Sequence, residues 1–93
     1  MNLMFSNCSS LSFLDLSSFD IANVTNLSGL FWNCYNLSFL DLSSFDTKNV
    51  TDINGMFHKC NNLTKIILNK NYDNTKIINQ LKDSGISPKI ILS

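Results

Sequence analysis

The residues Ser-Phe-Leu-Asp-Leu-Ser-Ser-Phe-Asp occupy positions 12–20 and occur again, unchanged, at positions 38–46. The same interval of 26 residues separates other pairs and triplets, namely Phe5, Phe31 and Phe57, Cys8, Cys34 and Cys60, and Leu11, Leu37 and Leu63. A period this regular predicts stacked repeat units, because a unit this short cannot bury its apolar face alone. We divide the chain into units 1–26, 27–52 and 53–68, followed by a C-terminal segment, 69–93.

Each unit combines two hydrophobic periods. Leu14 and Leu16 alternate with polar residues, which predicts a short strand with the leucines inward. Further along, Leu30, Phe31 and Cys34 recur at the spacing of a helix. Helix N-caps are expected at Thr25 or Asn26 and at Thr51 or Asp52. The predicted fold is an α/β repeat, a solenoid with a short parallel sheet, helices on its convex side and a C-terminal cap.

The C-terminal segment has the pattern of that cap. A helix is expected at about residues 75–83, with Gly85 at its end, and a strand at about residues 89–92. The opposite end starts in the middle of a unit and has no equivalent cover. We therefore expect that Met1 is an internal position of a longer protein, and that the open N-terminal end supports a homodimer.

Composition and charge exclude several functions. The seven acidic and seven basic residues give a net charge of zero, and none of the basic residues is Arg. All the residues before Lys48 together include four Asp and no basic residue, which argues against a nucleic-acid ligand. No apolar run approaches the roughly 20 residues of a membrane helix, so membrane insertion is not expected. The first residues also lack the features of a secretory signal.

The repeated motif LxxLDLSSFDxxNVTxxxxxFxxC resembles the BspA-like leucine-rich repeats. It is present at 11–25 and 37–51, and its Phe-x-x-Cys element at 5–8, 31–34 and 57–60. The resemblance covers roughly residues 1–68. It implies a leucine-rich-repeat-type solenoid that is displayed on a cell surface or secreted as part of a longer protein. It also implies a role in adhesion to a protein or other ligand of host or neighbouring cells, and no catalytic residues. If Met1 is the true start, the location is instead cytoplasmic.

The outward positions of the predicted strands are the candidate ligand-binding residues. They form an aromatic row and an acidic row on the concave face, and comprise Phe13, Asp15, Ser17, Phe39, Asp41, Ser43 and Lys65. Concave faces are the usual binding surfaces of solenoids. The alternative is that identical residues at equivalent positions stack only to stabilise the sheet.

The inward positions are the candidate core. This set comprises Phe5, Cys8, Leu14, Leu16, Phe31, Cys34, Leu40, Leu42, Phe57 and Cys60. The three cysteines lack the close spacing of zinc ligands, and we expect them to pack as small apolar side chains.

The remaining polar positions suggest no chemistry. Asp20 and Asp46 are expected to brace loops, and a calcium site is the less favoured reading. Trp32 is either a contact point or a cover over the rim of the core, and His58 is expected to be an isolated surface side chain.

With no nucleophile–base pair or metal set, we expect neither an enzyme nor a cofactor. An interaction module is the favoured function, and a structural spacer or repeat remnant is the alternative.

Overall fold

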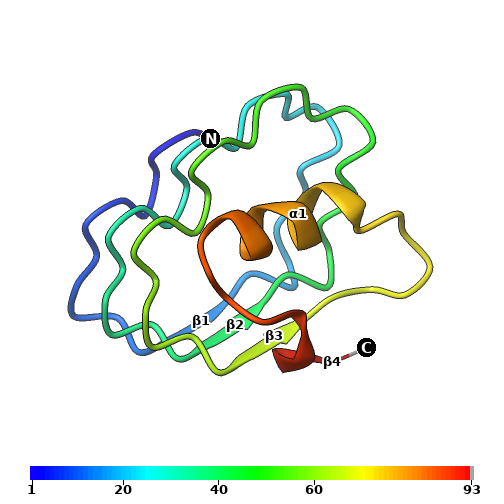
Figure 1. The fold of residues 1–93 in the computed structure, drawn as a ribbon. Coiled ribbons are helices and arrows are strands. Elements are labelled where there is room, and N and C mark those ends of the chain that lie inside the picture. Colours follow the sequence, from blue (N-terminus) through cyan, green and yellow to red (C-terminus); the bar gives the residue numbers. More distant parts are fainter. Residues whose placement is uncertain (93) are drawn as a thin grey trace.

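The computed structural model describes residues 1–92 and contains one parallel sheet. Its strands are β1 (Phe13–Asp15), β2 (Phe39–Asp41), β3 (Lys65–Ile67) and β4 (Ile91–Leu92), arranged in that order. Each of the first three strands comes from one repeat unit, and the strands lie next to one another along the bottom of Figure 1. Strand β4 comes from the C-terminal segment.

The register of the sheet follows the sequence period. Phe13 pairs with Phe39, and Phe39 pairs with Lys65. The middle residues of β2 and β3, Leu40 and Ile66, are fully buried, because alternate residues of a strand face opposite sides of the sheet. The predicted pairing of equivalent positions in neighbouring units is therefore confirmed.

The predicted helix in each unit is wrong. Residues 27–34 and 53–60 form consecutive turns, in which Leu30 N–H bonds to Leu27 O and Cys34 N–H to Phe31 O. Gly29 and Asn33 have φ angles of 60° and 63°, which a right-handed helix does not allow. The apolar residues at helical spacing still reach the core, because every turn of this kind also returns them to the same side.

Hydrogen bonds between units explain why turns replace helices. Gly29 N–H donates to Asn54 O and Phe31 N–H donates to Met56 O, so alternate amides bond to the next unit. A helix would use these amides internally. The expected helix N-caps are also wrong, because Asn26 and Asp52 instead accept from the amides two residues later and close local turns.

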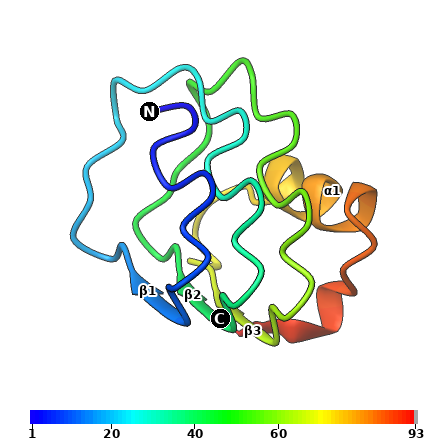
Figure 2. The same ribbon diagram turned by 90° about the vertical axis from the view of Figure 1, so that its left-hand side faces the viewer.

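The core runs through the three units. The rings of Phe5, Phe31 and Phe57 stack on one another, with centroids 5.9 Å apart at each step. Phe31 and Phe57 are fully buried, whereas Phe5 is only half-buried. The first unit is thus the less covered end of the stack, and Figure 2 shows its chain at the side away from helix α1.

Helix α1 (Thr75–Asp83) covers the other end and comprises the same residues as the predicted helix. It lies across the core in Figure 1, with Ile77 and Leu81 fully buried. Its Gln80 side chain accepts a hydrogen bond from Gly55 N–H at 3.1 Å. In the second unit, the equivalent Gly29 amide bonds to a carbonyl of the following unit, so Gln80 takes the place of a fourth unit.

The chain after α1 differs in part from expectation. Gly85 has a φ of 77° just beyond the helix, as expected for a helix end. Pro88–Ile90 form a short 3-10 helix, and β4 begins only at Ile91, so the predicted strand at 89–92 is too long. Pro88 fits the first position of the 3-10 helix because it has no amide hydrogen to leave unpaired.

Candidate functional site

The aromatic row lies on the outer face of the sheet. Phe13 and Phe39 point away from the core because Leu14 and Leu40, their neighbours in the strands, point into it. The two rings are stacked, with centroids 4.6 Å apart and planes within 5° of parallel. Phe13 is 57% exposed and Phe39 is half-buried. The structure therefore brings the two rings together and leaves the first one accessible.

The acidic row is held in place by local turns. Asp15 Oδ1 accepts from Ser17 N–H at 2.9 Å, and Asp41 Oδ1 accepts from Ser43 N–H at the same distance. The hydroxyl and amide of Ser17 hold the pKa of the Asp15 carboxyl below its ordinary value, because both donate to the ionised form. Each carboxyl group is thus held in place at the end of its strand.

Lys65 continues the aromatic row into the third unit. It pairs in register with Phe39 and is exposed, while Ile67 takes the position of Asp15 and Asp41. The outer strand face, defined here as Phe13, Asp15, Phe39, Asp41 and Lys65, therefore changes from aromatic and acidic to basic along the stack. Ser17 and Ser43 lie just past β1 and β2, and serve the two carboxylates as amide donors.

The proposed core positions differ between units. The second and third units contain fully or almost fully buried members, namely Phe31, Cys34, Leu40, Leu42, Phe57 and Cys60. In the first unit Leu16 is buried, but Phe5, Cys8 and Leu14 are only half-buried. The difference follows from position, because in residues 1–92 nothing covers the first unit on its outer side.

The thiols form a ladder of their own. Cys34 Sγ lies 2.9 Å from Phe5 O, and Cys60 Sγ lies 3.0 Å from Phe31 O, so each thiol donates to the preceding unit. Burial raises the pKa of the Cys60 thiol to about 12 and also raises that of Cys34. All three cysteines are free. Among residues 1–92, no group of three or more His, Cys, Asp or Glu side chains is arranged to hold a metal ion.

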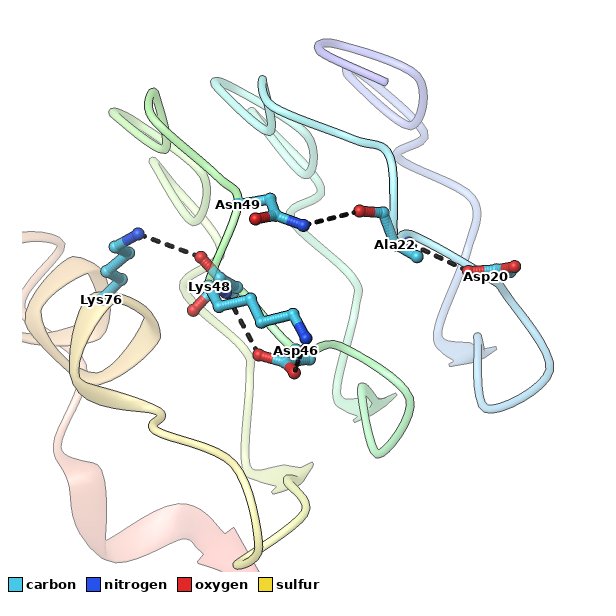
Figure 3. A network of polar contacts seen from close by, with 7 residues as sticks. Asp20, Ala22, Asp46, Lys48, Asn49 and Lys76 are labelled. Carbon is cyan, nitrogen blue, oxygen red and sulfur yellow. Dashed lines mark hydrogen bonds and ion pairs between the residues drawn. The ribbon is translucent and has the colours of Figure 1, made fainter.

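A second feature lies on the loops that follow β1 and β2. Asp20 Oδ1 accepts from Ala22 N–H, and Asp46 Oδ1 accepts from Lys48 N–H, so both acids brace their loops. Asn49 then links the two loops by donating from Nδ2 to Ala22 O, as Figure 3 shows. These loops line a hollow of about 340 Å³. We call it the loop groove.

Sequence reasoning identified the acids of the loop groove as braces, with a calcium site as the less favoured reading. It missed Tyr72, which also lines the groove and lies 26 residues after Asp46. No signal in the repeat pattern indicated Tyr72, because it lies beyond the last unit, where the pattern has broken down.

Trp32 and His58 pack against each other on the turn side. Their ring centroids are 4.1 Å apart, and Trp32 is 37% exposed. The Trp32 ring also lies over Gly55, where a Cβ atom would come within 2.8 Å of it. Trp32 thus covers part of the rim of the stack, and His58 is partly covered rather than isolated.

A sequence of similar units, paired in parallel register around a shared apolar core, defines a small repeat protein. The model of the family described as "Mycoplasma protein of unknown function, DUF285" matches residues 1–84, and the chain belongs to this family. The match extends through α1, so the helix that covers the third unit belongs to the family pattern. No curated protein and no solved structure matches the chain.

Proposed function

We propose that the chain is a non-catalytic interaction and adhesion module, and that it forms the C-terminal part of a BspA-like surface protein. Its contact surface is the outer strand face, and its partner is a protein or other ligand on host or neighbouring cells. The repeated motif and the exposed aromatic row support this proposal. The alternative is a structural spacer or repeat remnant with no specific ligand.

The same proposal includes the type of repeat. We infer that each 26-residue unit is one turn of a leucine-rich-repeat-type solenoid, with the outer strand face on its concave side. Three features support this inference: the LxxLDLSSFD motif, the parallel in-register strands and the ladder of hydrogen bonds between turns. The convex side would then carry consecutive turns in place of helices.

The exposed Phe13–Phe39 stack is the observation that carries the functional proposal. The two rings lie on the face of the sheet opposite to the core, and Phe13 is 57% exposed. Accessible aromatic side chains are enriched where proteins bind partners, because a ring contributes a large rigid contact area. The carboxyl groups of Asp15 and Asp41, held by turns at the end of the same strands, add polar contacts beside the rings.

The absence of catalysis is part of the proposal. The buried thiols of Cys34 and Cys60 are held protonated, which removes them as nucleophiles. His58 packs on the Trp32 ring, with ring centroids 4.1 Å apart. No helix within residues 1–92 is long and apolar enough to cross a membrane.

The direct test of the proposal is adhesion. Fluorescent beads coated with the purified chain are incubated with cultured epithelial cells, and bound beads are counted. The double variant Phe13→Ser with Phe39→Ser is expected to lose most of the adhesion, because both rings are removed. The variant Tyr35→Ser is the matched control, since Tyr35 is also an exposed aromatic residue (45%) but lies outside the strands.

Circular dichroism and thermal unfolding first establish that each variant is folded. Undiminished adhesion by a folded double variant would remove the outer strand face from the proposal. If beads with the unaltered chain do not adhere, the spacer becomes the better account. Surface display is tested separately by brief protease treatment of intact native cells, where release of peptides from this chain is the expected result and their absence contradicts display.

A further inference from the structure

The loop groove is built from three successive levels of the stack. Its lining comes from residues 19–22 in the first unit, from residues between 44 and 49 in the second, and from Tyr72 in the C-terminal segment. Figure 3 shows the first two loops side by side, with Asp20, Ala22, Asp46, Lys48 and Asn49 along them. The groove is therefore a feature of the stacked units and not of any single loop.

Its composition changes in one step along the stack. Positions 20 and 46 are equivalent in the repeat and both carry Asp, whereas Tyr72 comes from the C-terminal segment, beyond the last unit. The apolar part of the lining is Phe19, which is half-buried, and Ile21, which is 3% exposed. A row of carboxylates thus ends at an aromatic ring, above an apolar wall.

The polar atoms of the groove are held by hydrogen bonds that leave acceptors free for a ligand. Asp20 and Asp46 use Oδ1 for the amides of their own loops, at 2.9 Å and 3.1 Å. Asn49 uses Nδ2 for Ala22 O at 2.9 Å. Within residues 1–92, Asp20 Oδ2 and Asn49 Oδ1 remain as acceptors without a hydrogen-bond donor, and Asp46 Oδ2 has only a 3.9 Å ion pair with Lys48.

The groove also offers one mobile donor. Lys48 Nζ is 3.9 Å from Asp46 Oδ2, a loose ion pair, and the Lys48 side chain is 73% exposed. Lys48 is therefore able to turn toward a ligand at small energetic cost, because exposed ion pairs contribute little. With two carboxylates and one ammonium group, the groove suits neither a simple anion nor a simple cation.

A ligand with several hydroxyl groups fits this mixture, because each hydroxyl both donates and accepts. Hydroxyls donate to carboxylates in short, charge-assisted bonds, and they accept from an ammonium group. An apolar ring face of the same ligand would pack on Tyr72 and Phe19. A hollow of about 340 Å³ is at the lower end of the range for small-molecule sites, which is about 300–1,000 Å³.

We propose that the loop groove binds a neutral sugar ring, held by Asp20, Asp46 and Asn49 and packed on Tyr72. The proposed sugar site is separate from the outer strand face and independent of the function proposed for it. Loop bracing and ligand binding do not compete at the two Asp residues, since the bracing bonds use only Oδ1. Asp20 and Asp46, which recur at the 26-residue interval, thereby both brace their loops and bind the sugar.

The test uses two-dimensional ¹H–¹⁵N NMR of the whole chain. Methyl glycosides of glucose, galactose, mannose and N-acetylglucosamine are titrated into the tens of millimolar, a range that detects weak single-ring binding. At least one sugar is expected to shift the amide signals of Ala22, Lys48 and Asn49 saturably, without moving those of Phe13 and Phe39. Matching disaccharides then distinguish a free sugar, which binds equally well alone, from a unit within a glycan, which binds more tightly when extended.

Two variants connect the shifts to the groove. Asp20→Asn and Asp46→Asn keep the Oδ1 acceptor that braces each loop but replace the second carboxylate oxygen by an amide group. Each is expected to weaken sugar binding about tenfold, as for loss of one hydrogen bond to a charged group. Asp15→Asn and Asp41→Asn are matched controls, because they alter the same kind of turn in the same units outside the groove, and their binding is expected to stay unchanged.

Three outcomes would overturn the sugar site. The first is no saturable shift with any of the four glycosides. The second is a set of shifts that lies elsewhere on the chain. The third is equal binding by the unaltered chain, Asp20→Asn and Asp46→Asn. None of them bears on adhesion through the outer strand face, so the two proposals fail separately.

Discussion

Gly29 and Gly55 occupy the same position in successive units, and both have left-handed backbone conformations, with φ angles of 60° and 69°. Leu3, the equivalent residue of the first unit, has the same conformation at 59° despite its side chain. The turn thus requires positive φ in every unit. At Gly55 the absence of a side chain has a further role, because the Trp32 ring lies where a Cβ atom would be.

The comparison of Gly55→Ala with Gly85→Ala tests this role. Gly85 also has positive φ, at 77°, but a Cβ there meets nothing within 4 Å. We expect Gly85→Ala to cost about 1 kcal/mol of unfolding free energy, the ordinary penalty of the left-handed conformation. Gly55→Ala should cost about 2 kcal/mol more, because the Trp32 ring must also move. Urea unfolding measures both, and equal losses would mean that Trp32 is not packed on Gly55.

The cysteine ladder predicts a graded reactivity. Cys34 and Cys60 are buried and donate to backbone carbonyls, whereas Cys8 is half-buried at the open end of the stack. In the folded chain iodoacetamide at pH 8 is expected to modify Cys8 first and to leave Cys60 unmodified. Mass spectrometry of the peptides measures the order. Rapid modification of Cys60 under conditions where the chain is folded would contradict the ladder.

The same ladder predicts a dependence of stability on pH. Burial raises the pKa of Cys60 from an ordinary value of 9.0 to about 12, so the folded chain keeps a proton that the unfolded chain releases. The contribution of this thiol is complete below pH 9 and is lost as the pH rises from about 9 toward 12. Unfolding midpoints measured across this range should fall more for the unaltered chain than for Cys60→Ala.

At the scale of elements, α1 acts as the end of the stack by imitating a further unit. Gln80 supplies a side-chain carbonyl to the Gly55 amide. Lys76 Nζ donates to Thr47 O and Val50 O at 3.0 Å and 2.7 Å, which Figure 3 shows in part. In the second unit, Asn49 and Thr51 donate to carbonyls of the first in the same region. Helix α1 thus pairs the Gly55 amide and the carbonyls of Thr47 and Val50 without continuing the repeat.

The variant Gln80→Met tests the imitation. Met fills a similar volume but leaves the Gly55 amide without its acceptor, so we expect a loss of about 1–3 kcal/mol of unfolding free energy. Asn79→Met is the control, because Asn79 is the exposed neighbour on the same helix, and its effect should stay within about 0.5 kcal/mol. Similar small effects for both variants, measured by urea unfolding, would show that the Gln80 hydrogen bond contributes little.

The elements differ in how well the sequence predicts them. The alternation of Leu14 and Leu16 with polar residues predicts the strands, and the 26-residue interval predicts their register, because equivalent residues in a parallel stack lie side by side. The helix at 75–83 has its own apolar face and is isolated from the repeats. Within the units, however, turns and helices return apolar residues to the same side at similar spacing. Gly29 with Gly55, and Asn7 with Asn33, were the residues that indicated turns.

For the whole molecule, the unequal ends predict self-association. Phe5, Leu14, Phe19 and Val24 are only partly buried, whereas Phe31, Leu40, Phe45 and Val50 at the equivalent positions are 0–2% exposed. We therefore expect a homodimer that covers the first unit, since apolar surface at the end of a stack favours association. Light scattering over a range of concentrations should show twice the mass of one chain at high concentration. A monomer throughout would contradict the dimer.

Only those features of the candidate site that repeat every 26 residues could be predicted from the sequence. The interval places Phe13 beside Phe39 and Asp15 beside Asp41, and the alternation within the strand places all four outward. The stacking of the rings and the fixing of each carboxylate by a turn depend on side-chain geometry, which the interval does not contain. The loop groove depends on Tyr72, where the repeat pattern has already broken down, so periodicity alone did not reveal it.

The outer strand face as a contact surface is tested most directly by photo-crosslinking. Phe13 or Tyr35 is replaced by benzoylphenylalanine, the folded chain is bound to epithelial cells, and the cells are irradiated. The account predicts a discrete adduct with a cell-surface molecule from position 13 and none from position 35. Adducts from position 35 with none from position 13, or no adduct from either position, would contradict it.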